Sequence, residues 1–450
     1  MKRKYAIIGA GPTGLGAARR LMELGEKDFI VLEKNSYAGG LASSFTDEKG
    51  FTWDIGGHVV FSHYEYYDNL LAEILLDEYL EHLRESWVRT VKTWVPYPFQ
   101  NNIRHLPNQI KWECVRGLLP GIRSEDTPAN FYEWINNTFG AGIAKYFMLP
   151  YNYKVWATYP EMMSFSWIGE RVSVVDLKTV IKNIILEQDQ LSWGPNNKFR
   201  FPLKGGTGSI YKKLAETISG NILYNACVSS IDHKNKILTD AEGNNYEYEY
   251  LLSTAPVDIL IKTWLDKPSD DLVNAANMLK HNSVVVAGIG LSTSKEDTRC
   301  WMYFPDDDSP FYRVTNFHNY SPNNTPIPGE GRALMCEISY SNHKKIDHDQ
   351  VLSQVEDGLV NTTMITEEDR KDIISRWSIN VDYGYPIPCL QRDEALQILQ
   401  PALESMSIFS RGRFGGWKYE VSNMDHSVMQ GVEWAERMIN GKPETTYRIS

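Results

Sequence analysis

The strongest constraint on this chain lies at residues 5–14, where an apolar run enters a Gly-x-Gly-x-x-Gly turn that leads into a helix-like segment. Gly9 permits a sharp turn, Gly11 lets the backbone approach a pyrophosphate, and Gly14 lets the helix pack against the strand. The helix N-terminus then offers unpaired N–H groups and the positive end of its dipole to phosphates. The pattern predicts the first strand, turn and helix of a dinucleotide-binding domain.

A second apolar run, residues 29–32, ends in Glu33. This carboxylate follows the glycine turn by about 20 residues, the position from which an acidic side chain accepts a ribose hydroxyl. A Gly-x-Gly-x-x-Gly motif alone is a weak signal, and a glycine-rich turn without a ligand is the competing explanation. The two strands and the acidic terminus together favour a bound dinucleotide.

The pair Gly39-Gly40, followed by Leu41, favours FAD over NAD. NAD domains have no general need for a glycine pair after the ribose carboxylate, whereas the longer FAD molecule requires further close approach of the backbone. The block resembles the flavoprotein superfamily that includes amine oxidases, protoporphyrinogen oxidases, phytoene desaturases and UDP-galactopyranose mutases. That resemblance implies FAD as the cofactor.

Composition excludes several function classes. The 450-residue chain has 46 basic and 57 acidic residues, a net charge of −11, so we expect no nucleic-acid partner and no binding to anionic membranes. Five scattered cysteines without a C-x-x-C motif indicate a reducing, cytoplasmic location, and no stretch is apolar enough for membrane insertion. We also expect no metal, because the acids and histidines at residues 343–349 lack a further ligand at metal-site spacing.

Strand and helix patterns alternate in an interrupted order, which predicts an α/β fold of three parts. These are an FAD-binding Rossmann-like domain (1-100, 200-280 and 380-450), an inserted, mainly helical substrate-binding domain (101-199), and an antiparallel β-sheet substrate domain (281-379, with contributions from neighbouring segments). In the helical part, Thr127-Pro128 predicts a helix start, with Thr127 as the cap and proline at the first helical position.

Dense polar and aromatic blocks narrow the family. They lie at residues 53–63, 94–102, 150–156, 167–172, 193–196, 311–313, 384–386 and 412–427. In this order the blocks resemble the eukaryotic-type branch of the UDP-galactopyranose mutase family, over almost the whole chain. The resemblance implies an isomerase that interconverts UDP-galactopyranose and UDP-galactofuranose by non-redox ring contraction, through a sugar adduct at nitrogen-5 of reduced FAD. It also implies NADPH as the direct reductant of the flavin.

The same resemblance implies site residues. Catalytic roles fall to His58, Arg171, Arg313 and Arg413. Substrate binding falls to Tyr97, Phe99, Gln100, Phe147, Asn152, Trp156, Asn196, Tyr303, Tyr385 and Tyr419. Besides Gly9, Gly11, Gly14, Glu33, Gly39, Gly40 and Leu41, cofactor binding falls to Gly57, Val228, Asn423 and Asp425.

Residue chemistry agrees with these roles. Planar guanidinium forks suit a diphosphate better than lysine point charges do, and Arg313 follows Phe311 and Tyr312, an unusual setting for a solvated arginine. The competing interpretations are a surface salt bridge for Arg313, helix-end capping for Asn196, and core packing for any single aromatic residue. A flat uracil ring would stack on the aromatic faces near Tyr97.

Several alternatives stay open from the sequence. The chain lacks an insertion that is common in eukaryotic-type relatives after residues 319–322, which leaves the oligomeric state and the NADPH affinity open. A flavin oxidase or desaturase on the same fold, and a flavin-dependent sensor without turnover, are rival functions. The same ring contraction on another nucleotide-linked pyranose is a third alternative.

Overall fold

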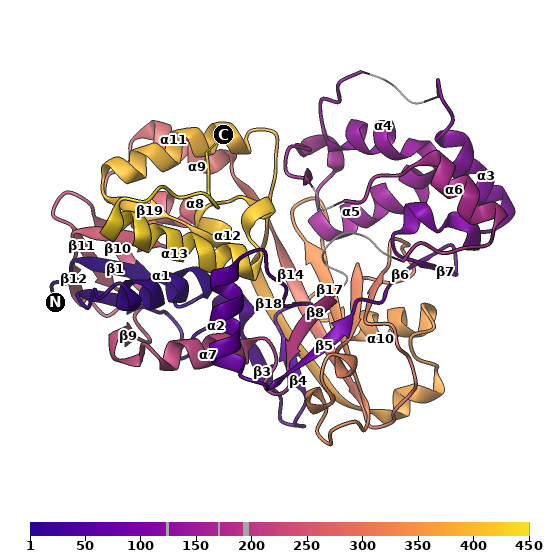
Figure 1. The fold of residues 1–450 in the computed structure, drawn as a ribbon, viewed down its shortest axis with the longest axis horizontal. Coiled ribbons are helices and arrows are strands. Elements are labelled where there is room, and N and C mark those ends of the chain that lie inside the picture. The colour runs from indigo at the N-terminus through magenta and orange to yellow at the C-terminus, as the bar shows by residue number, and fades with distance from the viewer. Residues whose placement is uncertain (123–125, 170–171, 192–197, 450) are drawn as a thin grey trace.

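The computed structural model describes residues 1–122, 126–169, 172–191 and 198–449. A parallel sheet lies in the left half of the molecule in Figure 1. The strand order is β19-β13-β1-β2-β9. Its strands are β1 (Tyr5–Ile8), β2 (Phe29–Leu32), β9 (Ile222–Leu223), β13 (Tyr250–Ser253) and β19 (Ile408–Ser410). The chain therefore enters this sheet at widely separated points.

Helices cover both faces of this sheet (Figure 1). They are α1 (Pro12–Glu23), α2 (Glu65–Leu75), α7 (Gly208–Glu216), α8 (Val257–Ile259), α9 (Asp270–Met278), α11 (Arg392–Ser405) and α13 (Met424–Asn440). Helices α1 and α13 touch through glycines. A Cβ atom on Gly16 would lie 2.6 Å from the carbonyl oxygen of Val428, and one on Gly431 would lie 2.0 Å from that of Thr13. This contact brings the start of α13 beside the glycine turn.

A second, mixed sheet forms the other large layer, in the order β18-β14-β17-β16-β15-β6-β7. Its strands are β6 (Ser86–Thr90), β7 (Thr93–Pro96), β14 (Lys280–Leu291), β15 (Trp301–Tyr303), β16 (Arg313–Asn316), β17 (Arg332–Tyr340) and β18 (Ile373–Ile387). All neighbours are antiparallel except β15 and β6. The sheet thus extends beyond the predicted 281-379 on both sides and takes in two strands that the sequence assigned to the first part of the cofactor domain.

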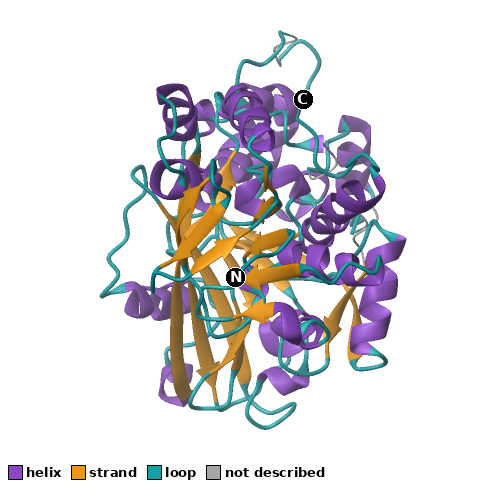
Figure 2. Ribbon diagram, turned by 90° about the vertical axis from the view of Figure 1, so that its left-hand side faces the viewer, coloured by secondary structure: helices purple, strands orange, loops and turns teal. Residues whose placement is uncertain are grey.

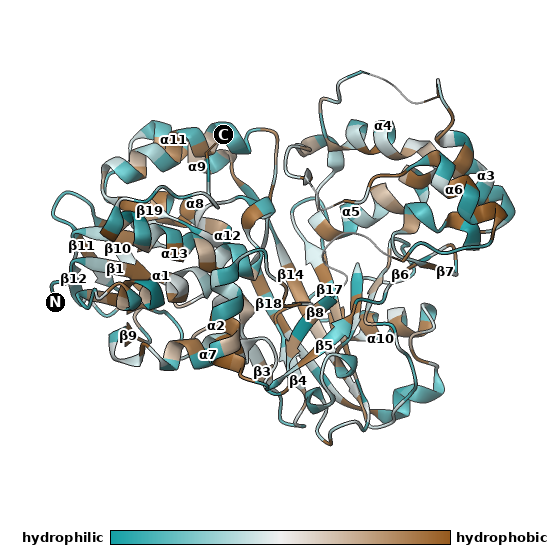
Figure 3. Cartoon of the chain, viewed as in Figure 1, coloured by the Kyte–Doolittle hydropathy of each residue, from teal (hydrophilic) through white to brown (hydrophobic). Residues whose placement is uncertain are grey.

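In Figure 3, apolar residues lie along β14 and β17, two central strands of this mixed sheet. The long strands lie side by side in Figure 2. Side chains are buried from Val284 to Leu291 in β14 and from Arg332 to Ser339 in β17. Smaller elements around the sheets are β3 (Ser44–Thr46), β4 (Thr52–Asp54), β5 (Tyr79–Leu83), β8 (Lys198–Pro202), β10 (Val228–Asp232), β11 (Ile237–Asp240), β12 (Asn245–Glu247) and α10 (Val351–Asn361).

The third part is helical, at the upper right of Figure 1. It contains α3 (Asn108–Gly117), α4 (Phe131–Ile143), α5 (Leu149–Trp156) and α6 (Leu177–Ile185). The predicted helix start at Thr127-Pro128 is wrong. Helix α4 begins at Phe131 because the Asn130 side chain accepts from the Glu133 N–H at 3.0 Å, while the Glu133 carboxylate accepts from the Ala129 N–H at 2.7 Å. These two contacts, which resemble a capping box but end on Ala129 instead of the N-cap residue, fix the start three residues later.

None of the helices in the described ranges combines the length and apolar character needed to cross a membrane. The five cysteines, all within the described residues, are free thiols, and only Cys227 is exposed.

Candidate active site

The two glycine motifs pack on each other. A Cβ on Gly14 would lie 1.9 Å from the carbonyl oxygen of Gly9, so a side chain there would separate helix from strand. The N–H of Gly39 donates to the carbonyl of Ala10 at 2.8 Å, and a Cβ on Gly40 would lie 3.2 Å from Cα of Gly11. The turn after β1 and the turn after β2 therefore form one cradle of bare backbone, the shape that a dinucleotide pyrophosphate requires.

Glu33 lies buried at the end of β2, beside this cradle. Its carboxylate accepts from the N–H of Ala10 at 2.7 Å and from the N–H of Asn35 at 2.9 Å. Each oxygen retains a lone pair that can accept a ribose hydroxyl. Leu41 packs against the apolar cluster that contains Val228, so both predicted contacts lie in the wall on this side of the cradle.

Arg313 begins β16, where it is opposite Tyr303 of β15 and Glu337 of β17. Its Nε donates to Glu337 Oε1 at 2.6 Å, its terminal nitrogen pairs with Oε2, and its guanidinium lies 4.4 Å from the Trp301 ring centre. The side chain is 13% exposed, so this is not the solvated surface salt bridge that competed in the sequence.

Glu337 holds more than Arg313. Its carboxylate also accepts from the Tyr312 hydroxyl at 2.7 Å and from the N–H of Gly57 at 2.9 Å. Burial alone would raise the pKa of Glu337, but the charge and hydrogen bonds of Arg313 lower it below the usual value. Sequence reasoning missed this residue. Its signal is a single charge within the apolar run of β17, and only the sheet register shows what it faces.

His58 lies between charged groups next to this cluster. Burial, with the nearby charges of Arg413 and Arg313, lowers its pKa to about 4, although Glu337 opposes the shift. Nδ1 is buried and has no hydrogen-bond partner among the described residues. His58 is therefore a neutral imidazole at neutral pH, with a ring nitrogen available to a ligand.

Tyr385 contacts both Arg313 and Arg413, the predicted catalytic arginines that lie within the described residues. Its hydroxyl lies 3.3 Å from the Tyr312 hydroxyl and 3.4 Å from a terminal nitrogen of Arg313. The Arg413 guanidinium lies 4.9 Å from the Tyr385 ring centre and 5.8 Å from that of Tyr419. Residues that the sequence places 72 and 100 positions apart from Arg313 thus form one cationic, phenol-lined cluster.

The aromatic side chains predicted for the base continue from Tyr303. Ring centres are 5.3 Å apart for Tyr303 and Tyr97, and 5.1 Å apart for Tyr303 and Tyr151. Phe147 lies 5.4 Å from Tyr151 and 4.9 Å from Phe99. Because Tyr303 is paired with Arg313 in the sheet, this aromatic wall begins where the cationic cluster ends.

The amide residues of this wall behave differently from each other. Gln100 donates to the carbonyl of Ser173, and its Oε1 is buried without a partner among the described residues. Asn152 donates to the Met148 carbonyl at 2.7 Å and accepts from Trp156 Nε1 at 3.2 Å, so it orients Trp156 from within the helical segment. Among the described residues Gln100 therefore keeps an open acceptor, whereas these contacts of Asn152 are structural.

Trp156 joins the wall to the tyrosines of the cationic cluster. Its ring centre lies 4.9 Å from that of Tyr419 and 5.8 Å from that of Tyr385. Arg171 and Asn196, predicted near the sugar, lie outside the described residues. The structure consequently brings together the described residues that the sequence predicts for the substrate, from Phe99 at one end to Arg413 at the other.

The start of α13 holds the remaining cofactor predictions. Asn423 is the N-cap residue, and the Asp425 carboxylate lies 2.7 Å from His63 Nδ1 and 2.9 Å from His426 Nδ1. Burial opposes the charge of Asp425, but hydrogen bonds with the two histidines lower its pKa. Within the described ranges this trio has metal-ligand spacing, a pattern that the sequence did not reveal, since His63 is 362 residues away. The predicted absence of a metal stays a prediction.

Comparisons with known proteins concern the fold and the family of the chain. The family model described as flavin containing amine oxidoreductase matches residues 12–439. A crystal structure of reduced UDP-galactopyranose mutase is 43% identical, with a TM-score of 0.95 and coverage of 99% of this chain and 96% of the other. Putrescine oxidase (17%, TM-score 0.64, 98% and 99% covered) and a fatty acid isomerase from P. acnes (15%, TM-score 0.64, 97% and 98% covered) share the fold.

Curated relatives match over shorter stretches. The FAD-dependent oxidoreductase dpchF of Colletotrichum higginsianum is 24% identical over 246 residues, 53% of this chain and 50% of the relative. A 15-cis-phytoene desaturase of Glycine max is 33% identical over 82 residues, 18% of this chain and 14% of the relative. The matched segments span half or less of these relatives.

Proposed function

The chain belongs to the UDP-galactopyranose mutase family of flavin-containing amine oxidoreductases and is a flavin-dependent isomerase, and we propose that it interconverts UDP-galactopyranose and UDP-galactofuranose without net redox change. The observation that carries the proposal is the cluster of Arg313, Tyr385 and Arg413 beside an aromatic wall. An oxidase or desaturase has no need for paired guanidinium groups at its substrate.

The cationic cluster would hold the diphosphate. Arg313 is only 13% exposed and has one carboxylate partner, Glu337, so its charge acts in a partly desolvated setting where an anion binds strongly. The phenols of Tyr385 and Tyr419 lie on the Arg413 side and can donate to phosphate oxygens. The two guanidiniums and phenols would retain UDP while its bond to the sugar is broken.

The aromatic wall would hold the uracil. Tyr97 and Phe99 supply ring faces, and the buried Oε1 of Gln100, which has no partner among the described residues, can accept from the uracil N–H. The arrangement orders the substrate from base to diphosphate to sugar along one line of residues.

The cradle of Gly9, Gly11 and Gly40 fits FAD, because a Cβ on Gly9 would lie 2.3 Å from Thr254 Oγ1 and one on Gly40 would lie 3.2 Å from Cα of Gly11. Only glycines let these two turns pack together as bare backbone, which a pyrophosphate can approach closely. When bound in its reduced form, FAD supplies a nucleophilic nitrogen toward the anomeric carbon, and NADPH is the proposed reductant. Beside Glu337, Arg313 and Arg413, His58 contributes a neutral imidazole whose Nδ1 has no partner among the described residues.

The carboxylates of Asp54, Glu337 and Glu420 do not offer an alternative, glycosidase-type route. Glycosidase-type reactions need two carboxyl groups flanking the anomeric carbon. Asp54 is bound to Ser44 at 2.5 Å, Glu420 is paired with Arg392 at 2.8 and 2.9 Å, and Glu337 is held by Arg313. Glu170 lies outside the described residues.

The decisive experiment is anaerobic incubation of the dithionite-reduced holoenzyme with UDP-galactopyranose and a panel of other UDP-pyranoses, followed by chromatography. We expect UDP-galactofuranose from reduced enzyme and none from oxidised enzyme. Conversion of a different UDP-sugar in place of UDP-galactose would reassign the substrate. Consumption of oxygen or of an electron acceptor in proportion to product would contradict an isomerase.

Hydride trapping tests the covalent role of the flavin. Cyanoborohydride is added during anaerobic turnover, and the extracted flavin is examined by mass spectrometry. We expect a mass increase that corresponds to one hexose. Formation of furanose product while all flavin stays unmodified would argue against covalent chemistry at nitrogen-5.

A further inference from the structure

Residues 442–449, named here the strap, run back over the segment that carries Arg413 and Tyr419. The Tyr447 hydroxyl donates to the carbonyl of Gly416 at 3.0 Å, and a Cβ on Gly416 would lie 2.7 Å from the Tyr447 ring. Lys418 Nζ donates to the carbonyl of Arg448 at 2.6 Å. The strap therefore contacts this segment through both its side chains and its backbone.

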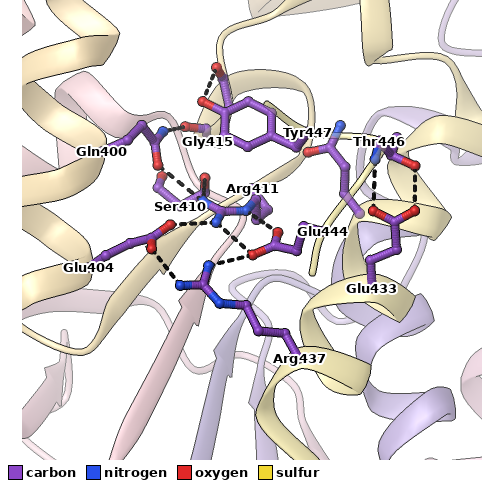
Figure 4. A network of polar contacts seen from close by, with 12 residues as sticks. Gln400, Glu404, Ser410, Arg411, Gly415, Glu433, Arg437, Glu444, Thr446 and Tyr447 are labelled. Carbon is purple, nitrogen blue, oxygen red and sulfur yellow. Dashed lines mark hydrogen bonds and ion pairs between the residues drawn. The ribbon is translucent and has the colours of Figure 1, made fainter. Parts of the chain in front are cut away.

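Ion pairs fix the other end of the contact (Figure 4). Arg411 is 2% exposed and donates to both carboxylate oxygens of Glu444, at 2.5 and 2.9 Å, and to Glu404 at 2.6 Å. Arg437 of α13 donates to the same two carboxylates, at 2.8 Å for Glu444 and 2.9 Å for Glu404. Burial opposes the charge of Arg411, yet the hydrogen bonds and charge of Glu444 raise its pKa.

The segment between these contacts has little regular structure of its own. Its helix, α12 (Gly412–Gly415), has four residues, too few to be stable without tertiary contacts. Trp417 has a φ of +54°, which is strained for a bulky side chain and persists only where the surroundings hold it. The position of Arg413 and Tyr419 therefore depends on contacts from outside the segment.

We propose that Glu444 and Tyr447 are positioning residues for the substrate site. Glu444 acts through Arg411, and Tyr447 acts through the backbone of Gly416, so that together they fix Arg413 and Tyr419 beside Tyr385. The inference rests on the proposed function, because it assigns those two side chains to the diphosphate and the sugar. The contacts described above link the two residues to Gly416 and Arg411, which flank Arg413 in the chain.

The test compares Tyr447→Ala and Glu444→Ala with Tyr447→Phe in the dithionite-reduced FAD holoenzyme. Tyr447→Phe keeps the ring against Gly416 and removes only the hydroxyl. Lys442→Ala is the matched control, because the contact of this exposed strap residue is with Glu436, at 3.1 Å, and not with residues 411–419. The readouts are hydrogen exchange at residues 411–419, FAD per chain, UDP affinity and the separate values of KM and kcat.

We expect both alanine variants to raise hydrogen exchange at residues 411–419 by about tenfold or more, because local opening becomes easier. UDP affinity should fall by about threefold or more and KM should rise, while FAD per chain stays at the wild-type level. Tyr447→Phe should recover most of the affinity, and Lys442→Ala should match the wild type.

Two results would overturn the proposal. One is faster exchange at 411–419 with wild-type UDP affinity and KM, because the strap would then be only a structural clamp. The other is loss of FAD together with UDP affinity, because the effect would then act through the cofactor. Absence of UDP binding in the wild type is a separate outcome. It would overturn the proposed function itself and, with it, the assignment of Arg413 and Tyr419.

Discussion

Arg313 and Glu337 pair across two adjacent strands, and Glu337 makes two separate contributions. The carboxylate keeps a partly buried guanidinium charged and oriented before any ligand arrives. It also binds the Gly57 N–H, so the backbone beside His58 is connected to the proposed diphosphate site. Removing either partner therefore has different and measurable effects.

Arg313→Ala should nearly abolish turnover and weaken UDP binding, while FAD content stays near normal. Loss of a partly buried, charge-assisted contact costs on the order of 2–5 kcal/mol, or about 30-fold or more in affinity. Fluorescence titration with UDP measures it. Arg376→Ala is the control, because that arginine pairs with Glu356 at 2.6 Å in another part of the sheet. Unchanged UDP affinity would exclude Arg313 from the diphosphate site.

Glu337→Gln should destabilise the protein by about 3 kcal/mol, because Arg313 would keep a partly buried charge without a carboxylate. A bound diphosphate replaces that partner, so the increase in Tm on adding UDP should be larger in the variant than in the wild type. Thermal unfolding with and without UDP measures both effects. Glu356→Gln, which breaks an arginine pair elsewhere, should lower Tm without enlarging the UDP effect.

His58 predicts a pH dependence whose sign follows from its lowered pKa. Between the folded pKa of about 4 and the ordinary value of 6.5, the unfolded chain binds the proton more tightly. Stability is therefore lost as pH falls from 6.5 toward 4, by about 2 kcal/mol at pH 5. Urea unfolding of wild type and His58→Gln should diverge over this range and agree above pH 7. Parallel curves would show that His58 is not held neutral.

At the scale of elements, the α1–α13 crossing determines where the start of α13 lies relative to the glycine turn. Gly431→Ala should disturb it, because the added Cβ would lie 2.0 Å from the Thr13 carbonyl oxygen. Overpacking of this kind costs about 1–3 kcal/mol, and we expect a lower Tm and a reduced FAD content. Absorbance at the flavin band measures the latter. Gly220→Ala, where a Cβ meets open space, should retain full FAD content.

At the scale of elements, the correct sequence predictions are those that depend on local sequence patterns. The turn at Gly9, the strand that precedes Glu33 and the α/β class follow from patterns within a few tens of residues, and the fold confirms them. The Glu337–Arg313 pair was missed because it depends on the register of β16 and β17. The parallel pairing of β6 with β15 was missed because it joins distant segments. The roles of the individual site residues stay predictions.

For the whole molecule, the cradle and the family predict a yellow protein that releases FAD, not FMN, on denaturation. NADPH should bleach the flavin band anaerobically near neutral pH, without a separate reductase. NADPH oxidation should then stop while isomerisation continues, because the proposed reaction returns the flavin unchanged. Absorbance at the NADPH and flavin bands, with product analysis, measures this. NADPH consumption in proportion to product would indicate a reductase.

The discontinuous parallel sheet has a consequence for biosynthesis. β1 leaves a ribosome well before its neighbour β13 and the next strand, β19, which come from residues 250–253 and 408–410. At translation rates of about 5–20 residues per second, the first strand waits on the order of tens of seconds for these partners. β2 can pair with one edge of β1 early, but the edge that later pairs with β13 keeps its backbone groups unpaired throughout that interval. We therefore expect the yield of folded protein in a cell to depend on chaperone capacity during synthesis as well as on the stability of the finished fold.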